Sequence, residues 1–390
     1  MKTCGIVAEF NPFHNGHARL VKEARASGFD RVIAVMSGNF VQRGEPAVFE
    51  TSTRVAAALA GGVDAVIQLP VNYALSGAEN FARGAVGILD KTGAVDSLVF
   101  GSECADISLL KSVSDIFMRG DFSEEIGDEL KSGITYAAAR ENALRRREPR
   151  LADIVGSPNN ILGIEYISAL RRLNSRIEPV TFGRTAAHDC SETSGIYASA
   201  SEIRRMIYSG EDPKKFLPGF YDSFDNENTV SFDKFEAAVL CKMRRMTAEE
   251  IALSPDISEG IENRIAAACR KASTLEELYF EAKTKRYTLA RIRRTVMNSF
   301  IGITRDDAAA DPPYIRILGM TRAGAEIFAA MKESASLPLV SKTSDISGLA
   351  EAAKRVFSLE CAATDIYTAC LRSPLPAGAE ISRAPVIVKG

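Results

Sequence analysis

Short apolar runs alternate with longer amphipathic segments through the first hundred residues. The strand-length apolar runs are residues 4–10, 32–36, 65–69 and 97–100. The segments between them that we predict to be helices are residues 16–26, 51–60 and 78–91. Apolar strands that alternate with helices are typical of a parallel sheet covered on both faces. The pattern therefore predicts an α/β fold with a doubly wound, Rossmann-like parallel sheet, whose ligands bind at the carboxyl ends of the strands.

Helical patterns dominate the rest of the chain. Residues 107–147 are predicted to be helical, and a helix is expected after Ser157. A short strand follows at residues 179–184, and a helix at residues 199–210 ends at a glycine. Residues 218–228 are predicted to form a linker. We therefore divide the chain into a doubly wound domain, residues 1–220, and a mainly helical domain, residues 221–390.

Composition narrows the class of protein without naming an activity. With 46% hydrophobic and 25% charged residues, the 390-residue chain is an ordinary globular protein and neither a disordered nor a disulfide-rich one. Its net charge of −2 excludes a generic polycation. Seven scattered cysteines without a C-x-x-C pair, and no apolar run of about 18 residues, favour a reducing cytoplasm over secretion or a membrane.

Two of the three histidines lie three residues apart in the segment EFNPFHNGHARL, residues 9–20. This segment follows the first predicted strand and opens the first predicted helix. The N-terminus of a helix favours phosphate, and His14 and His17 project from one side of its first turn. They are therefore candidate catalytic residues that donate hydrogen bonds to phosphate oxygens. The alternatives are ordinary surface histidines, or a metal pair, which H-x-x-H without a third ligand supports less well.

The segment NPFHNGH resembles the H-x-G-H signature of the nucleotidyltransferase superfamily, which shares a doubly wound fold with class I aminoacyl-tRNA synthetases. The segment ASASEIR, residues 198–204, resembles that superfamily's second motif, I-S-S-T-x-I-R, with Ala198, Ala200 and Ser201 as the three changes. The resemblance implies that Ser199, Ser201 and Arg204 contact a triphosphate. Without it, the same segment is simply a capped helix.

Further segments narrow the resemblance to one subfamily. MSGNFVQRGEPAVF (36–49), FGSE (100–103), SPNNILGIEYISAL (157–170) and RTAAHD (184–189) are similar to the bacterial tRNA(Met) cytidine acetate ligases, densely over about residues 1–215 and more loosely at PPYIRILG. The resemblance implies an enzyme that activates acetate with ATP and Mg²⁺ as acetyl-adenylate and releases pyrophosphate. The acetyl group then passes to the exocyclic amine of the wobble cytidine of elongator tRNA(Met).

The same resemblance implies a set of ATP-binding residues. In the first motif they are Val7, Ala8, Glu9, Asn11, Pro12, Phe13, Gly16 and Leu20; beyond it they are Gly101, Asn159, Asn160 and Arg184. A glycine at a strand end admits an adenosine, amides bind through donors and acceptors, and an arginine holds phosphate in a fork. The alternatives are a tight turn, a helix cap and a solvated charge. The choice between Asn159 and Asn160 stays open.

The loop after the second strand is a candidate substrate loop. We expect it to close on the phosphates or on the small carboxylate through Ser37, Gly38, Asn39, Gln42 and Arg43. The alternative is a rigid turn.

Two basic segments are candidates for tRNA contacts. They supply Arg145, Arg146 and Arg147, and then Lys283, Lys285, Arg286, Arg291, Arg293 and Arg294. Between residues 240 and 300 there are 12 Lys and Arg against 8 Asp and Glu. Such cations suit phosphate contacts with a folded RNA, and Tyr287 is a candidate for base stacking. The alternative is a solvated helix face.

Two other functions remain open at this point. One is an adenylyltransferase that joins AMP to a small phosphorylated metabolite, and the other is a non-catalytic nucleotide- or RNA-binding protein. The chain is much longer than a compact nucleotidyltransferase, and its additional residues favour a macromolecular partner. We expect ATP with Mg²⁺ as a substrate complex, no metal ligated by the protein, no membrane association and no obligate protein partner.

Overall fold

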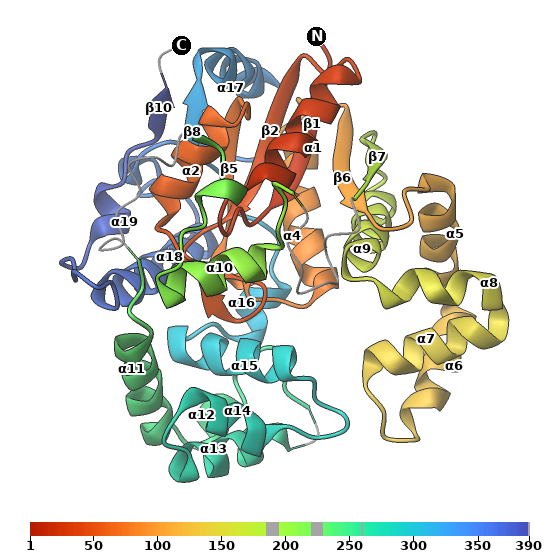
Figure 1. Ribbon diagram of the computed structural model, residues 1–390, viewed down its shortest axis with the longest axis vertical. Coiled ribbons are helices and arrows are strands. Elements are labelled where there is room, and N and C mark those ends of the chain that lie inside the picture. The colour runs from red at the N-terminus through yellow and green to blue at the C-terminus, as the bar shows by residue number, and fades with distance from the viewer. Residues whose placement is uncertain (185–194, 220–228, 259, 389–390) are drawn as a thin grey trace.

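The computed structural model describes residues 1–184, 195–219, 229–258 and 260–388. An eight-stranded sheet lies at its centre, with strand order β10-β8-β5-β2-β1-β6-β7 and with β9 paired to β8 off this path (Figure 1). The strands are β1 (Thr3–Ala8), β2 (Arg31–Ser37), β5 (Ala65–Leu69), β6 (Ser97–Ser102), β7 (Glu178–Gly183), β8 (Ile315–Thr321), β9 (Leu339–Val340) and β10 (Val386–Val388). The five N-terminal strands pair in parallel, which confirms the predicted doubly wound sheet.

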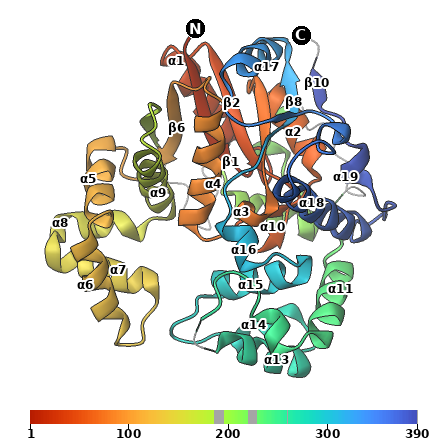
Figure 2. The ribbon, with the colours of Figure 1, turned by 180° about the vertical axis from the view of Figure 1, so that it is seen from behind.

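Helices cover both faces of this sheet (Figures 1 and 2). One face carries α1 (Asn15–Ala26), α2 (Thr51–Ala60) and α10 (Ala200–Ser209), and the other carries α4 (Ala78–Lys91), α9 (Pro158–Arg172) and α17 (Arg322–Ser334). Alternate residues of β2 serve the two faces: Ile33 and Val35 pack in the cluster of α4, and Val32 and Met36 in the cluster of α1 and α2. A continuous apolar run is therefore required in this strand.

A first helical module lies between β6 and α9. It comprises α5 (Ile107–Phe117), α6 (Gly120–Leu130), α7 (Tyr136–Arg147) and α8 (Pro149–Ala152). The Asp106 carboxylate accepts hydrogen bonds from the Ser108 and Leu109 N–H groups and so caps α5, and Thr135 caps α7. Figure 1 shows this module beyond the carboxyl end of β6.

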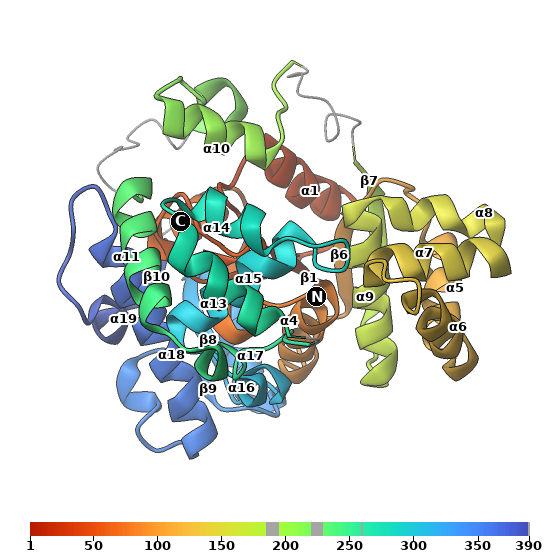
Figure 3. The same ribbon diagram turned by 90° about the horizontal axis from the view of Figure 1, so that it is seen from below.

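A second helical module has a core of its own. It comprises α11 (Phe232–Arg245), α12 (Ala248–Ile251), α13 (Ile261–Lys271), α14 (Leu275–Ala282) and α15 (Leu289–Ile301). Its core continues into Phe40 of the hairpin β3 (Phe40–Val41) and β4 (Glu45–Pro46), and into Leu75 after α3 (Val71–Ala74). Figures 1 and 3 show both helical modules beyond the carboxyl ends of the parallel strands. In the described part of the chain, no helix is both long and apolar enough to cross a membrane.

The last part of the chain returns to the sheet. After α16 (Arg305–Ala309), β8 pairs antiparallel with β5, and α18 (Glu351–Ala369), α19 (Ala379–Ser382) and β10 follow. The described residues after 229 are mainly helical, as expected. The sequence did not indicate that β8 of this part joins the sheet, because Ile317 pairs with Ile67, a partner too distant for a local pattern to reveal. Most of the expected linker, residues 220–228, and residues 185–189 of RTAAHD lie outside the described residues.

Candidate active site

His14 and His17 are held by the backbone at the start of α1. The Gly16 N–H donates to His14 Nδ1 at 3.0 Å, and the His14 N–H donates to His17 Nδ1 at 3.2 Å. Each imidazole therefore uses Nδ1 as an acceptor and carries its ring hydrogen on Nε2. The ring centroids lie 3.9 Å apart, tilted by 30°. The result is a pair of Nε2–H donors at the positive end of a helix, an arrangement suited to phosphate.

Gly16 is required by the position of His14. A Cβ added at Gly16 would lie 2.8 Å from His14 Cε1 and 3.0 Å from His14 Nδ1. Any larger residue would push the imidazole out of its hydrogen bond. The glycine of H-x-G-H thus makes room for the first histidine.

The residues before His14 support the loop. The Asn11 side chain accepts a hydrogen bond from the Val48 N–H at 2.8 Å, and Phe13 is fully buried. The ring of Phe10 meets His17 edge-on at 5.0 Å between centroids. Of the predicted ATP-binding residues here, Asn11, Pro12 and Phe13 are buried, while Val7, Ala8, Glu9, Gly16 and Leu20 are partly exposed.

One hollow joins the first motif to residues far along the chain. It is lined by His14, Gly16, His17, Arg19, Leu20, Glu23, Gly101, Phe182, Gly183 and Arg184. A Cβ at Gly101 would meet Arg184 Cγ at 2.9 Å, so the missing side chain accommodates the stem of this arginine. The carboxyl ends of β1, β6 and β7 thus converge on one site, as expected for a parallel sheet.

Asn159 and Asn160 have different roles at the start of α9. Asn160 is buried; its Oδ1 accepts from the Glu103 and Cys104 N–H groups at 2.9 and 3.1 Å, and its Nδ2 donates to the Ile154 carbonyl. Asn159 instead accepts from Arg184 Nη1 at 2.9 Å and donates to Glu103 Oε1 at 2.6 Å. Asn160 therefore joins two loops, and Asn159 positions the arginine of the hollow.

Arg204 brings the second motif to the first. It donates to the Asn11 carbonyl at 2.9 Å and to Ser201 Oγ at 3.2 Å, and Arg43 donates to the same hydroxyl at 3.0 Å. Burial lowers the pKa of Arg204 from its ordinary value, although a guanidinium stays charged at neutral pH. Ser199 caps α10 by accepting from the Glu202 N–H at 3.1 Å. A desolvated cation with neutral hydrogen-bond acceptors favours an anionic ligand.

The candidate substrate loop is largely a rigid turn. Fully buried Arg54 donates to the carbonyls of Glu9, Ser37, Gly38 and Phe49. The Asn39 side chain accepts from the Thr51 N–H and hydroxyl and donates to Thr364. The Gln42 N–H donates to Glu9, whose pKa is raised by burial. Ser37, Gly38 and Asn39 are thus enclosed, whereas Arg43 is exposed and reaches Ser201.

The first basic segment is paired with carboxylates. Arg145 pairs with Glu141 and Asp153, Arg146 with Glu129, and Arg147 with Asp121 and Glu125. These pairs link α7 to α6 and to Asp153 after α8.

The second basic segment divides into two parts. Arg291 donates to the Asp256 carbonyl, Arg293 pairs with Glu45 at 2.8 Å, and Arg294 lies 3.9 Å from Asp256. Lys283, Lys285 and Arg286 are exposed. The suggestion that Tyr287 stacks on a base is wrong, because this residue is only 5% exposed and Arg291 covers its ring at 4.7 Å.

Four residues that line the hollow were not assigned from the sequence, namely Arg19, Glu23, Phe182 and Gly183. The supporting residues Arg54 and Glu103 were not assigned either. Arg54 orders the loop through four carbonyls, and the only sequence signal is an arginine within the apolar helix TSTRVAAALA. Glu103 holds Asn159 and the Asn160 N–H, and it lies within the segment FGSE without a spacing that indicates its role. Among the described residues, no group of three His, Cys, Asp or Glu side chains is arranged to hold a metal ion.

Comparison with known proteins gives consistent matches. A model of the HIGH nucleotidyl transferase family matches residues 1–379. The chain is 38% identical to the tRNA(Met) cytidine acetate ligase of Acetivibrio thermocellus over 100% of both chains, and 40% identical to that of Caldicellulosiruptor saccharolyticus over 85% of this chain and 86% of the relative. The crystal structure of Thermotoga maritima TmcAL bound with alpha-thio ATP superposes with a TM-score of 0.91 at 31% identity, covering 100% of both chains.

Proposed function

Because the chain belongs to the HIGH nucleotidyl transferase family and, within it, to the tRNA(Met) cytidine acetate ligases, we propose that it is an ATP-dependent ligase that acetylates the wobble cytidine of elongator tRNA(Met). Acetate is the acyl donor, and ATP enters as its Mg²⁺ complex. We place this activity in the cytoplasm, where tRNA is used, and expect no obligate protein partner. The observation that carries the proposal is the pair of imidazoles whose Nδ1 atoms are both occupied by backbone N–H groups.

In the first step, an acetate oxygen attacks the α-phosphorus of ATP and the bond to the β-phosphate breaks, which gives acetyl-adenylate and pyrophosphate. His14 and His17 donate their Nε2 hydrogens to the phosphates and offset the charge that grows on the leaving group. Arg204 binds the same phosphates, and bound Mg²⁺ would neutralise further charge. Arg43, which shares the Ser201 hydroxyl with Arg204, holds a phosphate or the acetate.

We place the adenosine at the ends of β6 and β7, next to the histidines. Arg184, positioned by Asn159 and lying over Gly101, contacts the nucleotide at the ends of β6 and β7. Asn160 acts indirectly, through the loop that carries Glu103. Ser199 acts as the cap of α10 and so orients Ser201 and Arg204.

In the second step, the exocyclic amine of the wobble cytidine attacks the acetyl carbonyl, the bond to AMP breaks, and the amine loses a proton. This amine is a weak nucleophile because its lone pair is delocalised into the ring, so the acyl donor must be a mixed anhydride. No covalent enzyme intermediate is needed. The exposed cations Lys283, Lys285 and Arg286 hold the tRNA backbone.

The test is mass spectrometry of nucleosides from unmodified elongator tRNA(Met) after incubation with the protein, Mg-ATP and acetate. We expect an acetyl-sized mass gain on cytidine that disappears when ATP or acetate is omitted. Turnover of ATP that depends instead on a phosphorylated metabolite would replace the proposal with an adenylyltransferase. Binding of ATP without turnover on any acceptor would replace it with a binding protein.

A further inference from the structure

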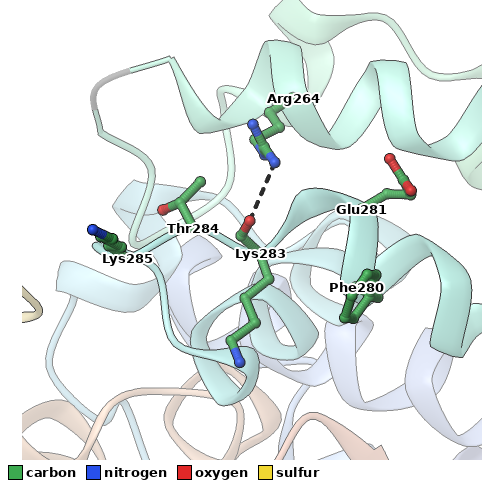
Figure 4. A pocket seen from close by; sticks show the side chains of 6 residues that line it. All are labelled: Arg264, Phe280, Glu281, Lys283, Thr284 and Lys285. Carbon is green, nitrogen blue, oxygen red and sulfur yellow. Dashed lines mark hydrogen bonds between the residues drawn. The ribbon is translucent and has the colours of Figure 1, made fainter.

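The second helical module carries an open hollow that is remote from the histidines in sequence. Its volume is about 500 Å³, and it is lined by Arg264, Phe280, Glu281, Lys283, Thr284 and Lys285 (Figure 4). The lining comes from α13, from the end of α14 and from the loop after it. A surface of this size accommodates a nucleotide-sized ligand.

Phe280 is the aromatic feature of the hollow. Its side chain is 75% exposed, although its helix neighbours Leu278 and Tyr279 are buried in the module core. Phe280 therefore contributes little to folding, and its exposure carries a hydrophobic cost that a ligand would remove. An exposed ring accepts a stacked nucleobase of any sequence.

The charge around the ring suits RNA. Three cations, Arg264, Lys283 and Lys285, line the hollow against the single carboxylate of Glu281. The Arg264 guanidinium donates to the Ala282 and Lys283 carbonyls at 3.0 and 3.2 Å, which holds the start of the loop that carries both lysines. Two exposed lysines and an aromatic ring line the same hollow, a combination that suits the phosphates that flank an unstacked base.

The hollow is also connected to the candidate active site. Lys285 and Arg293 are eight positions apart in the sequence, which limits their separation to about 29 Å. Arg293 in turn pairs with Glu45 in the hairpin that carries Gln42 and Arg43 of the substrate loop. A Cβ at Gly44 would lie 2.7 Å from the Arg293 backbone, so this hairpin packs directly on α15. One folded RNA can therefore reach both places.

We propose that this hollow binds an unpaired nucleotide of the tRNA, with its base stacked on Phe280 and its flanking phosphates on Lys283 and Lys285. The inference rests on the proposed function and adds a specific contact to it. Phe280 supplies stacking that is independent of salt, and the lysines supply the salt-dependent part of the affinity.

The experiment measures the Kd of the full-length protein for unmodified elongator tRNA(Met) at several salt concentrations. Phe280→Ala is expected to weaken binding by about tenfold or more, without changing the slope of log Kd against log salt. Lys283→Ala and Lys285→Ala are each expected to reduce that slope by about one. Phe280→Trp retains the ring and should bind within about twofold of the unchanged protein.

The matched control is Leu253→Ala, which removes a 61% exposed apolar side chain from the same module outside the hollow. It should leave both Kd and slope unchanged. Unaltered binding by Phe280→Ala, in a protein that acetylates tRNA, would overturn the hollow assignment and leave the proposed function standing. A protein that neither binds nor acetylates tRNA would overturn both. Dissociation of an oligomer by Phe280→Ala would assign the surface to a second copy of the chain.

Discussion

The carboxyl edge of the sheet and the basic segments differ in what holds their polar side chains. At the edge, His14 and His17 are fixed by backbone N–H groups within three residues. In the basic segments, the partner of Arg147 is up to 26 residues away and that of Arg293 is 248 residues away. When the backbone of a motif holds the motif's own side chains, their arrangement can be predicted from the local sequence. The arrangement of a run of charges cannot be predicted until its distant partners are known.

The largest effect on turnover is expected from removal of a histidine Nε2 donor. His14→Asn keeps a side-chain oxygen that accepts the Gly16 N–H and so keeps the helix cap, but it removes the Nε2 donor. We expect kcat to fall about 100-fold or more, as for His17→Ala, while Tm and the Kd for tRNA stay unchanged. Substantial turnover by His14→Asn would reduce this imidazole to a helix cap.

A second substitution tests how strongly kcat depends on the position of the His14 ring. Gly16→Ala places a Cβ 2.8 Å from His14 Cε1 and displaces the ring. Since a displacement of about 1 Å costs up to about 100-fold in rate, we expect kcat to approach that of the histidine variants. Gly127→Ala in α6, where an added Cβ meets nothing within 4 Å, is the control and should be silent. Equal rates for the two variants would contradict the reason given for the glycine.

The two neighbouring asparagines provide a sharper version of the test. Asn159→Ala removes the hydrogen bond that positions Arg184, so the KM for ATP should rise about tenfold without loss of stability. Asn160→Ala leaves the Glu103 and Cys104 N–H groups without their acceptor and should cost about 1–3 kcal/mol of unfolding free energy. Steady-state kinetics and thermal unfolding measure the two quantities. Interchanged effects would reverse the assignment.

Buried carboxyl groups behind the edge predict a pH dependence of stability. Burial and the nearby Glu380 raise the pKa of Glu360 to about 8. The unfolded chain therefore releases this proton at lower pH than the folded protein, and stability falls as pH rises toward about 8. Glu360→Gln cannot ionise, so its Tm should decline less between about pH 6 and pH 8. Parallel Tm profiles would show that Glu360 does not titrate in this range.

The smallest effect is expected in the first basic segment. Arg145 is already paired with Glu141 and Asp153, so Arg145→Ala should weaken tRNA binding by less than about twofold. Lys283→Ala, in the second segment, should weaken it more and lower the salt slope. A larger effect at Arg145 would mean that its carboxylate partners release it to the RNA.

The sequence was sufficient for the parallel half of the fold and for bringing the two motifs to one edge of the sheet. Alternating strand and helix signals located β1, β2, β5 and β6, and two motifs brought His14, His17 and Arg204 to one edge. The sequence could not show β8, because its pairing with β5 depends on contacts between distant segments. It also missed Arg54 and Phe280, since nothing local distinguishes an arginine that binds carbonyls or an aromatic ring that points to solvent.

The most direct test of the account is to count pyrophosphate and N-acetylcytidine in the same reaction with Mg-ATP, acetate and unmodified elongator tRNA(Met). We predict that the two accumulate in equal amounts, and that acetylation disappears when the wobble cytidine is replaced by uridine or when His17 is replaced by alanine. Acetylation that survives the His17→Ala change, or pyrophosphate release without any acetylated cytidine, would contradict the account.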